Sequence, residues 1–142
     1  MSEWKTQFYN KYVKLYEQYE IIAAEKIKKL YDQDIENLLD PLNGNKYDFT
    51  CNNLSFEVKY DKASTVYSNF FIEYMGYGKP SGIATTQANY YIITDGEIYY
   101  LIETDKLKNL CNIHGKFITT RNKTTQGYII DKNIVISYSK II

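Results

Sequence analysis

Asp48, Glu57 and Lys59 are the residues whose types and spacing could do chemistry in this sequence. They lie in residues 47–61, where apolar and polar side chains alternate on both sides of Asn52-Asn53. Because successive side chains of a strand point to opposite faces, the alternation predicts a β-hairpin with one apolar and one polar face. Asn tolerates the positive φ of a tight turn. A two-residue turn there places Asp48 directly opposite Glu57, on the same face as Lys59.

This predicted pair of opposed carboxylates is unusual. Directly opposed side chains have Cβ atoms about 4.5–5.5 Å apart, and like charges so close are destabilising unless they share a proton or a cation. Mg²⁺ prefers such hard oxygen ligands, and Lys59 would place a positive charge beside an attacked phosphate. The spacing therefore fits a divalent-metal phosphodiesterase site. The alternative is a solvated hairpin face on which Lys59 only neutralises its neighbours.

The first 32 residues predict a long amphipathic helix. No proline or glycine interrupts Ser2 to Asp32, and apolar residues recur at steps of three and four. The apolar stripe consists of Phe8, Tyr12, Leu15, Tyr19, Ile22, Ala23, Ile27 and Leu30. Small residues one turn after Glu20 would let the helix lie close to a sheet and bring Glu20 to the carboxylates. Glu17 and Glu25 are competing candidates, and a solvated surface group is the simplest interpretation of any of the three.

Turn and helix signals flank the hairpin on both sides. Before it, residues 33–46 predict a helix tail or a short irregular strand and then a turn. After it, a second helix is predicted from Ser64 or Thr65 to Met75, with Gly76 as its stop. Its inward residues would be Val66, Phe70, Phe71 and Tyr74. Glu73 would lie on its exposed side, with a role near a metal as the less favoured alternative.

Two apolar runs joined by Asp95-Gly96 predict a second hairpin. Residues 89–94 and 97–103 are dense in Tyr, Ile and Leu. Such near-continuous apolar runs favour strands buried on both faces, in the middle of a sheet covered by helices. The remainder is predicted as a short helix over 105–112 capped by Thr104, followed by strands near 127–130 and 134–138.

Two polar loops hold side chains that could bind phosphate. The first, residues 77–88, is expected mainly to connect its neighbours. The alternative is hydrogen bonding to phosphate oxygens by Lys79, Ser81, Thr85, Thr86 and Gln87. In the second loop, Arg121 and Lys123 are the local candidates for a phosphate-backbone contact. His114 is the only histidine, so it has no second histidine for a metal site or catalytic pair, and it is predicted to lie at the surface.

Composition favours a single domain over residues 1–142, comprising a helical segment (1–32), a core (47–103) and a C-terminal helix with strands (104–142). Lys plus Arg and Asp plus Glu are 17 each, so no global basic field points to nucleic acid. Cys51 is predicted to be a small buried apolar residue. The amphipathic, charged N-terminus and the lack of an apolar run of about 20 residues predict a soluble, cytoplasmic protein without signal peptide or membrane span.

The order of these features resembles the PD-(D/E)XK nuclease superfamily, which includes restriction enzymes, Holliday junction resolvases and phage recombination nucleases. The resemblance covers about residues 15–103, and it rests on Glu20, Asp48 and Glu57-Val58-Lys59. It implies an α/β fold with a restriction-endonuclease-like αβββαβ core, a central mixed sheet flanked by helices, and extra C-terminal strands. Two features depart from the pattern. Tyr47 replaces the motif's proline, and the first core strand is missing unless part of 35–42 supplies it.

The resemblance also implies roles for individual residues. Asp48 and Glu57 would bind Mg²⁺, for which Mn²⁺ would substitute, with the Val58 carbonyl as a third ligand. Glu20 would complete the metal site or hold a metal-bound water. Lys59 would orient or help deprotonate the attacking water and stabilise charge on the phosphate.

The activity implied is hydrolysis of DNA phosphodiester bonds to a 5′-phosphate and a 3′-hydroxyl. With no separate sequence-reading domain in 142 residues, a structure-selective endonuclease of the junction-resolvase or recombination type, from a phage or mobile element, is favoured. A resolvase would act as a homodimer, because two symmetric cuts need two sites. The alternative is a catalytically inactive binding or inhibitor module of the same fold. The near-zero net charge favours that alternative, and the intact set of Asp48, Glu57 and Lys59 opposes it.

Overall fold

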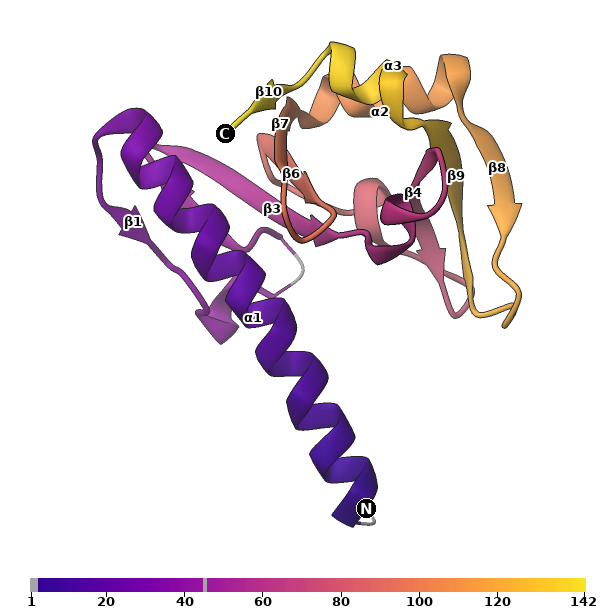
Figure 1. The fold of residues 1–142 in the computed structure, drawn as a ribbon, viewed down its shortest axis with the longest axis horizontal. Helices are drawn as coiled ribbons and strands as arrows, with labels where there is room; N and C mark the ends of the chain where they lie inside the picture. Colours follow the sequence, from indigo (N-terminus) through magenta and orange to yellow (C-terminus); the bar gives the residue numbers. More distant parts are fainter. Residues whose placement is uncertain (1–2, 45) are drawn as a thin grey trace.

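The computed structural model describes residues 3–44 and 46–142, with side chains from Lys14 onward. It has an α/β fold in which a six-stranded sheet, in the order β1-β2-β3-β6-β7-β10, lies beside a four-stranded sheet, β5-β4-β9-β8 (Figure 1). In the larger sheet β3 and β6 are parallel, and the other neighbours are antiparallel. The predicted class, α/β with a mixed central sheet and helices, is confirmed.

The chain passes through the following elements in order. They are α1 (Glu3–Tyr31), β1 (Ile35–Glu36), the 3-10 helix η1 (Pro41–Asn43), β2 (Phe49–Cys51), β3 (Leu54–Tyr60), η2 (Lys62–Thr65), β4 (Asn69–Gly76), β5 (Lys79–Pro80), η3 (Gly82–Ala84), β6 (Tyr90–Thr94), β7 (Tyr99–Glu103), α2 (Thr104–His114), β8 (Lys116–Thr119), β9 (Thr125–Asp131), α3 (Lys132–Ser137) and β10 (Lys140–Ile141).

The long N-terminal helix is confirmed, and α1 crosses the face of the β1-β2-β3 hairpin region (Figure 1). The predicted start at Ser2 and the stripe positions Phe8 and Tyr12 lie outside the residues or side chains that the structure describes. Ala23, Ala24 and Ile27 are buried against a sheet face that includes Phe49, Phe56, Ile92 and Leu101. None of the helices described is long and apolar enough to cross a membrane.

The first hairpin is confirmed, and its register is confirmed from the turn as far as Phe49 and Phe56, whereas the predicted pairing of Asp48 with Glu57 is not part of the ladder. Asn52 and Asn53 both have positive φ, 53° and 60°, as a two-residue turn of this kind requires. Cys51 then pairs with Leu54, and Phe49 pairs with Phe56. Cys51 is 2% exposed, as expected of a buried apolar residue. The short strand β1 pairs with the free edge of β2, so residues 35–42 do supply a strand before the hairpin.

The predicted second helix over 64–75 is wrong. Asp61, not Ser64 or Thr65, caps the short helix η2, and residues 69–76 form strand β4, which pairs with β9. Phe70 and Ile72 are buried at a spacing of two, whereas Val66 is 79% exposed. A short segment rich in aromatic and β-branched residues satisfies both periodicities, and pairing with β9 decides in favour of the strand.

The second hairpin is confirmed, with β6 and β7 antiparallel and buried on both faces. Its loop spans Asp95 to Ile98, because the Asp95 carboxylate accepts hydrogen bonds from the N–H groups of Glu97 and Ile98. Thr104 does not cap the following helix but is its first residue, and Glu103 occupies the cap position.

Two further predictions need correction in the C-terminal part of the chain. The strand predicted near 134–138 is the helix α3, which begins where Asp131 accepts a hydrogen bond from the Asn133 N–H at 2.7 Å. Residues 116–119, where no strand was predicted, form the edge strand β8 paired with β9. The strand predicted near 127–130 is confirmed as part of β9.

The two sheets share one apolar core, which positions the site. β4 and β9 of the smaller sheet contribute Phe70, Ile72 and Ile130 to it. β6 and β7 of the larger sheet contribute Tyr91, Ile93, Tyr100 and Ile102, and α2 and α3 close the remaining side. The polar face of β3 therefore looks toward the smaller sheet rather than toward open solvent.

Candidate active site

The Asp48 carboxylate is held by the backbone of the neighbouring strand. The β2–β3 ladder is regular only as far as Phe49 and Phe56, and at Asp48 the chain leaves it. The Asp48 N–H donates to the Phe56 carbonyl at 2.8 Å, and Asp48 Oδ2 accepts from the Val58 N–H at 2.7 Å. A side-chain oxygen thus takes the place of a main-chain partner, which fixes the carboxylate beside β3.

The Val58 carbonyl is directed toward the same edge of β3 as the Asp48 carboxylate. In a strand, the N–H and C=O of one residue point to the same side. Because the Val58 N–H meets Asp48, its carbonyl also points toward β2. This orientation is compatible with the ligand role that the resemblance implies for Val58.

The chain that leads into Asp48 is fixed by residues that the sequence analysis missed. Asn43 is 8% exposed, and its Nδ2 donates to the carbonyls of Asn37, at 2.7 Å, and of Asp48, at 3.2 Å. The Lys46 carbonyl accepts from the Gln87 N–H at 2.8 Å. The Asn43-Gly44 turn signal was visible in the sequence, but the amide's partners depend on long-range folding.

Glu57 and Lys59 lie on the same face of β3 and form an ion pair. Lys59 Nζ is 3.1 Å from Glu57 Oε1, and their side chains are 43% and 14% exposed. Burial alone would lower the pKa of Lys59, but Glu57, with smaller contributions from Asp48 and Glu73, outweighs it and raises that pKa. Lys59 therefore keeps its positive charge at this site.

Glu20 is the helix glutamate that the fold brings to the carboxylates. Burial and the nearby charges of Asp48, Glu57 and Glu17 raise the pKa of Glu20 to about 8, and a side-chain hydrogen bond with Asp48 adds to the shift. Two carboxyl groups can share such a bond only if one is protonated. Glu17 thus acts on the site through its charge, whereas Glu25 is exposed.

The neighbouring carboxyl groups of Glu20, Asp48 and Glu57 carry more negative charge than this buried site tolerates without compensation. Burial raises the pKa of Asp48, against the opposing effects of the Val58 N–H, Lys59 and Glu20. Burial, with Asp48, also raises the pKa of Glu57 to about 7 although Lys59 opposes the shift. Either protons or a cation must compensate this charge.

This donor set fits a hard divalent cation. Its oxygens come from Glu20, Asp48 and Glu57, and Mg²⁺ takes one or two protein carboxylates while keeping several waters. Within the described residues, however, no group of three or more His, Cys, Asp or Glu side chains is already close enough together to hold a metal ion. Binding would therefore require side-chain movements, including release of Glu57 from Lys59.

A second wall faces these residues across a cleft of about 270 Å³. We call it the carboxylate cleft; its lining is Gly44, Asp48, Glu57, Lys59, Glu73, Pro80, Ser81, Gly82 and Thr85. Glu73 was expected on the exposed side of a helix, but β4 places it here, half-buried. β4 is anchored to the end of β3 because Asp61 Oδ2 accepts from the Phe71 N–H at 2.8 Å.

The predicted phosphate-binding residues separate into two groups. Ser81 and Thr85 line the carboxylate cleft. Thr86 lies outside it, and its hydroxyl donates to the Lys46 carbonyl. The other candidates, Lys79, Gln87, Arg121 and Lys123, are exposed and do not line the cleft, and His114 is exposed as predicted.

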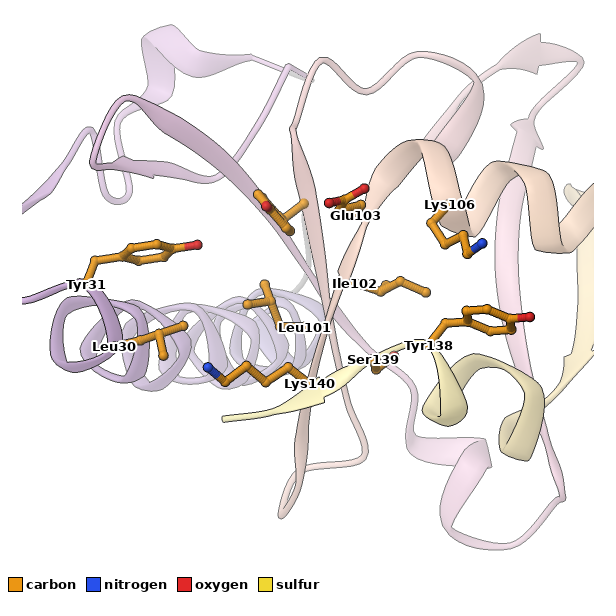
Figure 2. A pocket seen from close by; sticks show the side chains of 10 residues that line it. Leu30, Tyr31, Leu101, Ile102, Glu103, Lys106, Tyr138, Ser139 and Lys140 are labelled. Atoms are coloured by element: carbon orange, nitrogen blue, oxygen red, sulfur yellow. The ribbon is translucent and has the colours of Figure 1, made fainter.

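A cavity larger than the carboxylate cleft lies elsewhere, and Figure 2 shows its lining side chains. It measures about 750 Å³ and is lined by Leu30, Tyr31, Tyr90, Leu101, Ile102, Glu103, Lys106, Tyr138, Ser139 and Lys140. We call it the larger cavity. It shares no residue with the carboxylate cleft. Its size is therefore no guide to where the candidate chemistry is located.

Comparisons with protein-family models, curated proteins and solved structures give no match to this chain. Its function is therefore inferred from the geometry and chemistry of the carboxylate cleft.

Proposed function

We propose that this chain is a Mg²⁺-dependent, structure-selective DNA endonuclease of the restriction-endonuclease-like fold. The observation that carries the proposal is the convergence of separate segments around Asp48, which lines the cleft. α1 brings Glu20 to Asp48, and β3 presents Glu57 and Lys59 beside Asp48. Three acidic groups and one ammonium beside a polar cleft suit a phosphodiester substrate.

The arrangement of strands supports the same proposal. A long helix precedes three antiparallel strands, β1-β2-β3, and the next strand in the sheet, β6, is parallel to β3. This matches the αβββ part of the core that the resemblance implies. The connection between β3 and β6 departs from it, because β4, β5 and η3 occupy the place of the expected helix.

The residues of the cleft have separable roles in this proposal. Asp48 and Glu57 would hold Mg²⁺, with the Val58 carbonyl directed to the same edge and Glu20 beside Asp48. A bound Mg²⁺ polarises a phosphoryl oxygen and lowers the pKa of a bound water. Lys59 would orient the attacking water and stabilise the negative charge that develops on the phosphate.

The opposite wall would position the substrate. Ser81 Oγ is buried and has no hydrogen-bond partner among the described residues, and Thr85 lies next to it along the cleft. The Ser81 hydroxyl can donate to a phosphate oxygen, and the Thr85 hydroxyl can do so if it leaves the Gly82 carbonyl, to which it now donates at 3.4 Å. Water would attack phosphorus, the bond to the 3′-oxygen would break, and that oxygen would leave with a proton, giving a 5′-phosphate and a 3′-hydroxyl.

A second candidate function is a binding or inhibitor module without catalysis. The ion pair between Lys59 and Glu57 favours it, because the ammonium neutralises a carboxylate that catalysis would require for the metal. The lack of a preassembled three-acid group in the described part of the chain points the same way.

Metal binding and cleavage together test the two candidates. Calorimetry with Mg²⁺ and Mn²⁺ comes first, followed by incubation with branched, linear and single-stranded DNA, with and without metal. The endonuclease proposal expects metal-dependent cleavage of at least one of these DNAs, with 5′-phosphate ends. Metal binding without cleavage of any DNA would favour the binding module, and absence of metal binding would remove the endonuclease.

A further inference from the structure

In the proposed function, metal binding by Glu57 would remove the ion-pair partner of Lys59. Its ammonium now pairs with Glu57 at 3.1 Å. If Glu57 binds a divalent cation, its oxygens are drawn to that cation and the ammonium faces a doubly positive ion. Lys59 then needs another anionic partner in order to remain in the cleft, because like charges at this range repel strongly.

Glu73 is the acidic side chain placed to be that partner. It comes from β4 of the smaller sheet and lines the same cleft as Lys59. Glu73 makes no ion pair within 4.0 Å in the described structure, so no other basic side chain there competes with Lys59 for it. Its charge also favours the ammonium form of Lys59.

The backbone around Glu73 is rigidly packed. Gly82 has φ +52°, and a Cβ built there would lie 2.3 Å from the Glu73 carbonyl oxygen. The Ser81 N–H donates to the Tyr74 carbonyl at 2.9 Å. The loop from β5 to η3 is therefore pressed against β4, which limits how far Glu73 can move from the cleft.

A buried polar group without a partner among the described residues lies on β6, the strand next to β3. Tyr91 is 1% exposed, and its hydroxyl has no hydrogen-bond partner among the described residues. It pairs with Glu57 in the β3–β6 register. Burial and the charges of Glu57, Glu73 and Asp48 raise the pKa of Tyr91. A buried donor without an acceptor is costly, and such groups mark places where the structure expects a partner.

We propose that Glu73 is the positioning residue for Lys59. When a divalent cation occupies Glu57, the Lys59 ammonium passes from Glu57 to Glu73, which holds it on the far wall of the cleft. This inference rests on the proposed metal site, but it assigns Glu73 no contact with the metal. It extends the functional set beyond Glu20, Asp48, Glu57 and Lys59.

The test measures how accessible the Lys59 amine is, and it requires no DNA. The purified chain is acylated briefly, with and without saturating Mg²⁺, and modification of Lys59 is quantified by mass spectrometry against that of Lys116. The variants are Glu73→Gln and Glu73→Asp, with Glu103→Gln as the matched control, since Glu103 is an exposed carboxylate of the larger cavity.

In the wild type and in Glu103→Gln, Lys59 should stay protected with or without Mg²⁺. In Glu73→Gln, Lys59 should be protected without metal and become about tenfold more reactive with Mg²⁺, as for a loss of one pKa unit of stabilisation. Glu73→Asp should fall between the two. Equal protection in Glu73→Gln and the wild type at saturating Mg²⁺ would overturn the inference.

Calorimetry and kinetics separate this role from metal ligation. Glu73→Gln should leave the Kd for Mg²⁺ within about twofold and lower kcat about 10–100-fold with little change in KM. A tenfold or larger loss of Mg²⁺ affinity would make Glu73 a ligand and overturn the inference while sparing the proposed endonuclease. A wild-type chain that binds no Mg²⁺ would overturn both.

Discussion

The carboxylate cleft and the larger cavity differ in size and in how their polar groups are satisfied. The larger cavity has about 750 Å³, against about 270 Å³ for the cleft, yet its lining mixes apolar and polar side chains and its Lys106 ammonium lies 4.4 Å from the centre of the Tyr138 ring. The cleft is instead lined by Asp48 and Glu57, two carboxyl groups with raised pKa values, and by a buried Ser81 hydroxyl without a partner among the described residues. Carboxyl groups with raised pKa values and buried polar groups without partners, rather than the volume of a pocket, distinguish a candidate active site.

Among variants that test this difference between the cleft and the larger cavity, Asp48→Asn should have the largest effect. The amide oxygen can still accept the hydrogen bond from the Val58 N–H, while the negative charge is lost. We expect metal-dependent DNA cleavage to fall by about a thousandfold or more, since metal ligation fails, with the circular dichroism spectrum unchanged. Full cleavage by this variant would remove the assignment.

Lys59→Met should have the next largest effect, a loss of about 100–1000-fold in kcat through lost stabilisation of the phosphate charge. Lys106→Met is the matched control, because it removes a lysine from the larger cavity instead. Its cleavage rate should stay within about twofold of the wild type. Equal losses in both variants would indicate a general effect of surface charge.

Gly82→Ala tests the packing of the cleft's second wall. Its Cβ would collide with the Glu73 carbonyl, and we expect a loss of about 1–3 kcal/mol in the free energy of unfolding beyond that of Gly78→Ala. Gly78 is the matched control, since it also has positive φ, +75°, but open space around its Cβ position. Urea denaturation of both variants measures the difference, and equal losses would contradict it.

The metal-free protein should lose stability as pH rises from about 5 to about 8. Glu20 and Glu57 have folded-state pKa values of about 8 and about 7, above the ordinary value of 4.5. Their stabilising contribution is full below pH 4.5 and is lost as pH passes through those folded-state values. Calorimetry should therefore give a falling Tm over this range, less steeply in Glu20→Gln, and saturating Mg²⁺ should restore Tm at pH 8. A Tm that rises over this range would contradict the shifts.

The smallest effect is expected in the larger cavity. Tyr138→Ala removes the ring beneath Lys106, a partly exposed cation–π contact worth about 0.5–1 kcal/mol. Cleavage should not change. A loss of cleavage comparable to that of Lys59→Met would show that the larger cavity contributes to function and would end the contrast between the two regions.

The sequence predicted the near wall of the cleft and missed the far wall, for a physical reason. Asp48, Glu57 and Lys59 belong to one hairpin, and local alternation with a two-residue turn determines their face and register. Glu73 depends on the pairing of β4 with β9, in which it lies opposite Gly127, 54 residues later in the sequence. The aromatic segment before Gly76 fits helical and strand periodicity alike, so only this long-range pairing decides its structure.

The residues that cap the short helices show the same limit of prediction from local sequence. Asp61 and Asp131 each accept a hydrogen bond from a backbone N–H two or three residues later, and each begins a short helical segment. Both are recognisable capping residues, but Ser64 and Thr65 offered an equally good helix start. The tertiary hydrogen bond from Phe71 to Asp61 separates these alternatives, and no local pattern reveals it.

The cleft lies between two sheets, so substitutions far from it can change the distance between its walls. Its walls are joined by the hydrogen bond between Asp61 and Phe71 and by the apolar core beneath them, where Ile83 of η3 is 2% exposed. Truncating such a core side chain would let the smaller sheet tilt and change the gap between Lys59 and Glu73. The proposed DNA cleavage should therefore respond to substitutions of buried hydrophobic residues that would contact neither metal nor DNA.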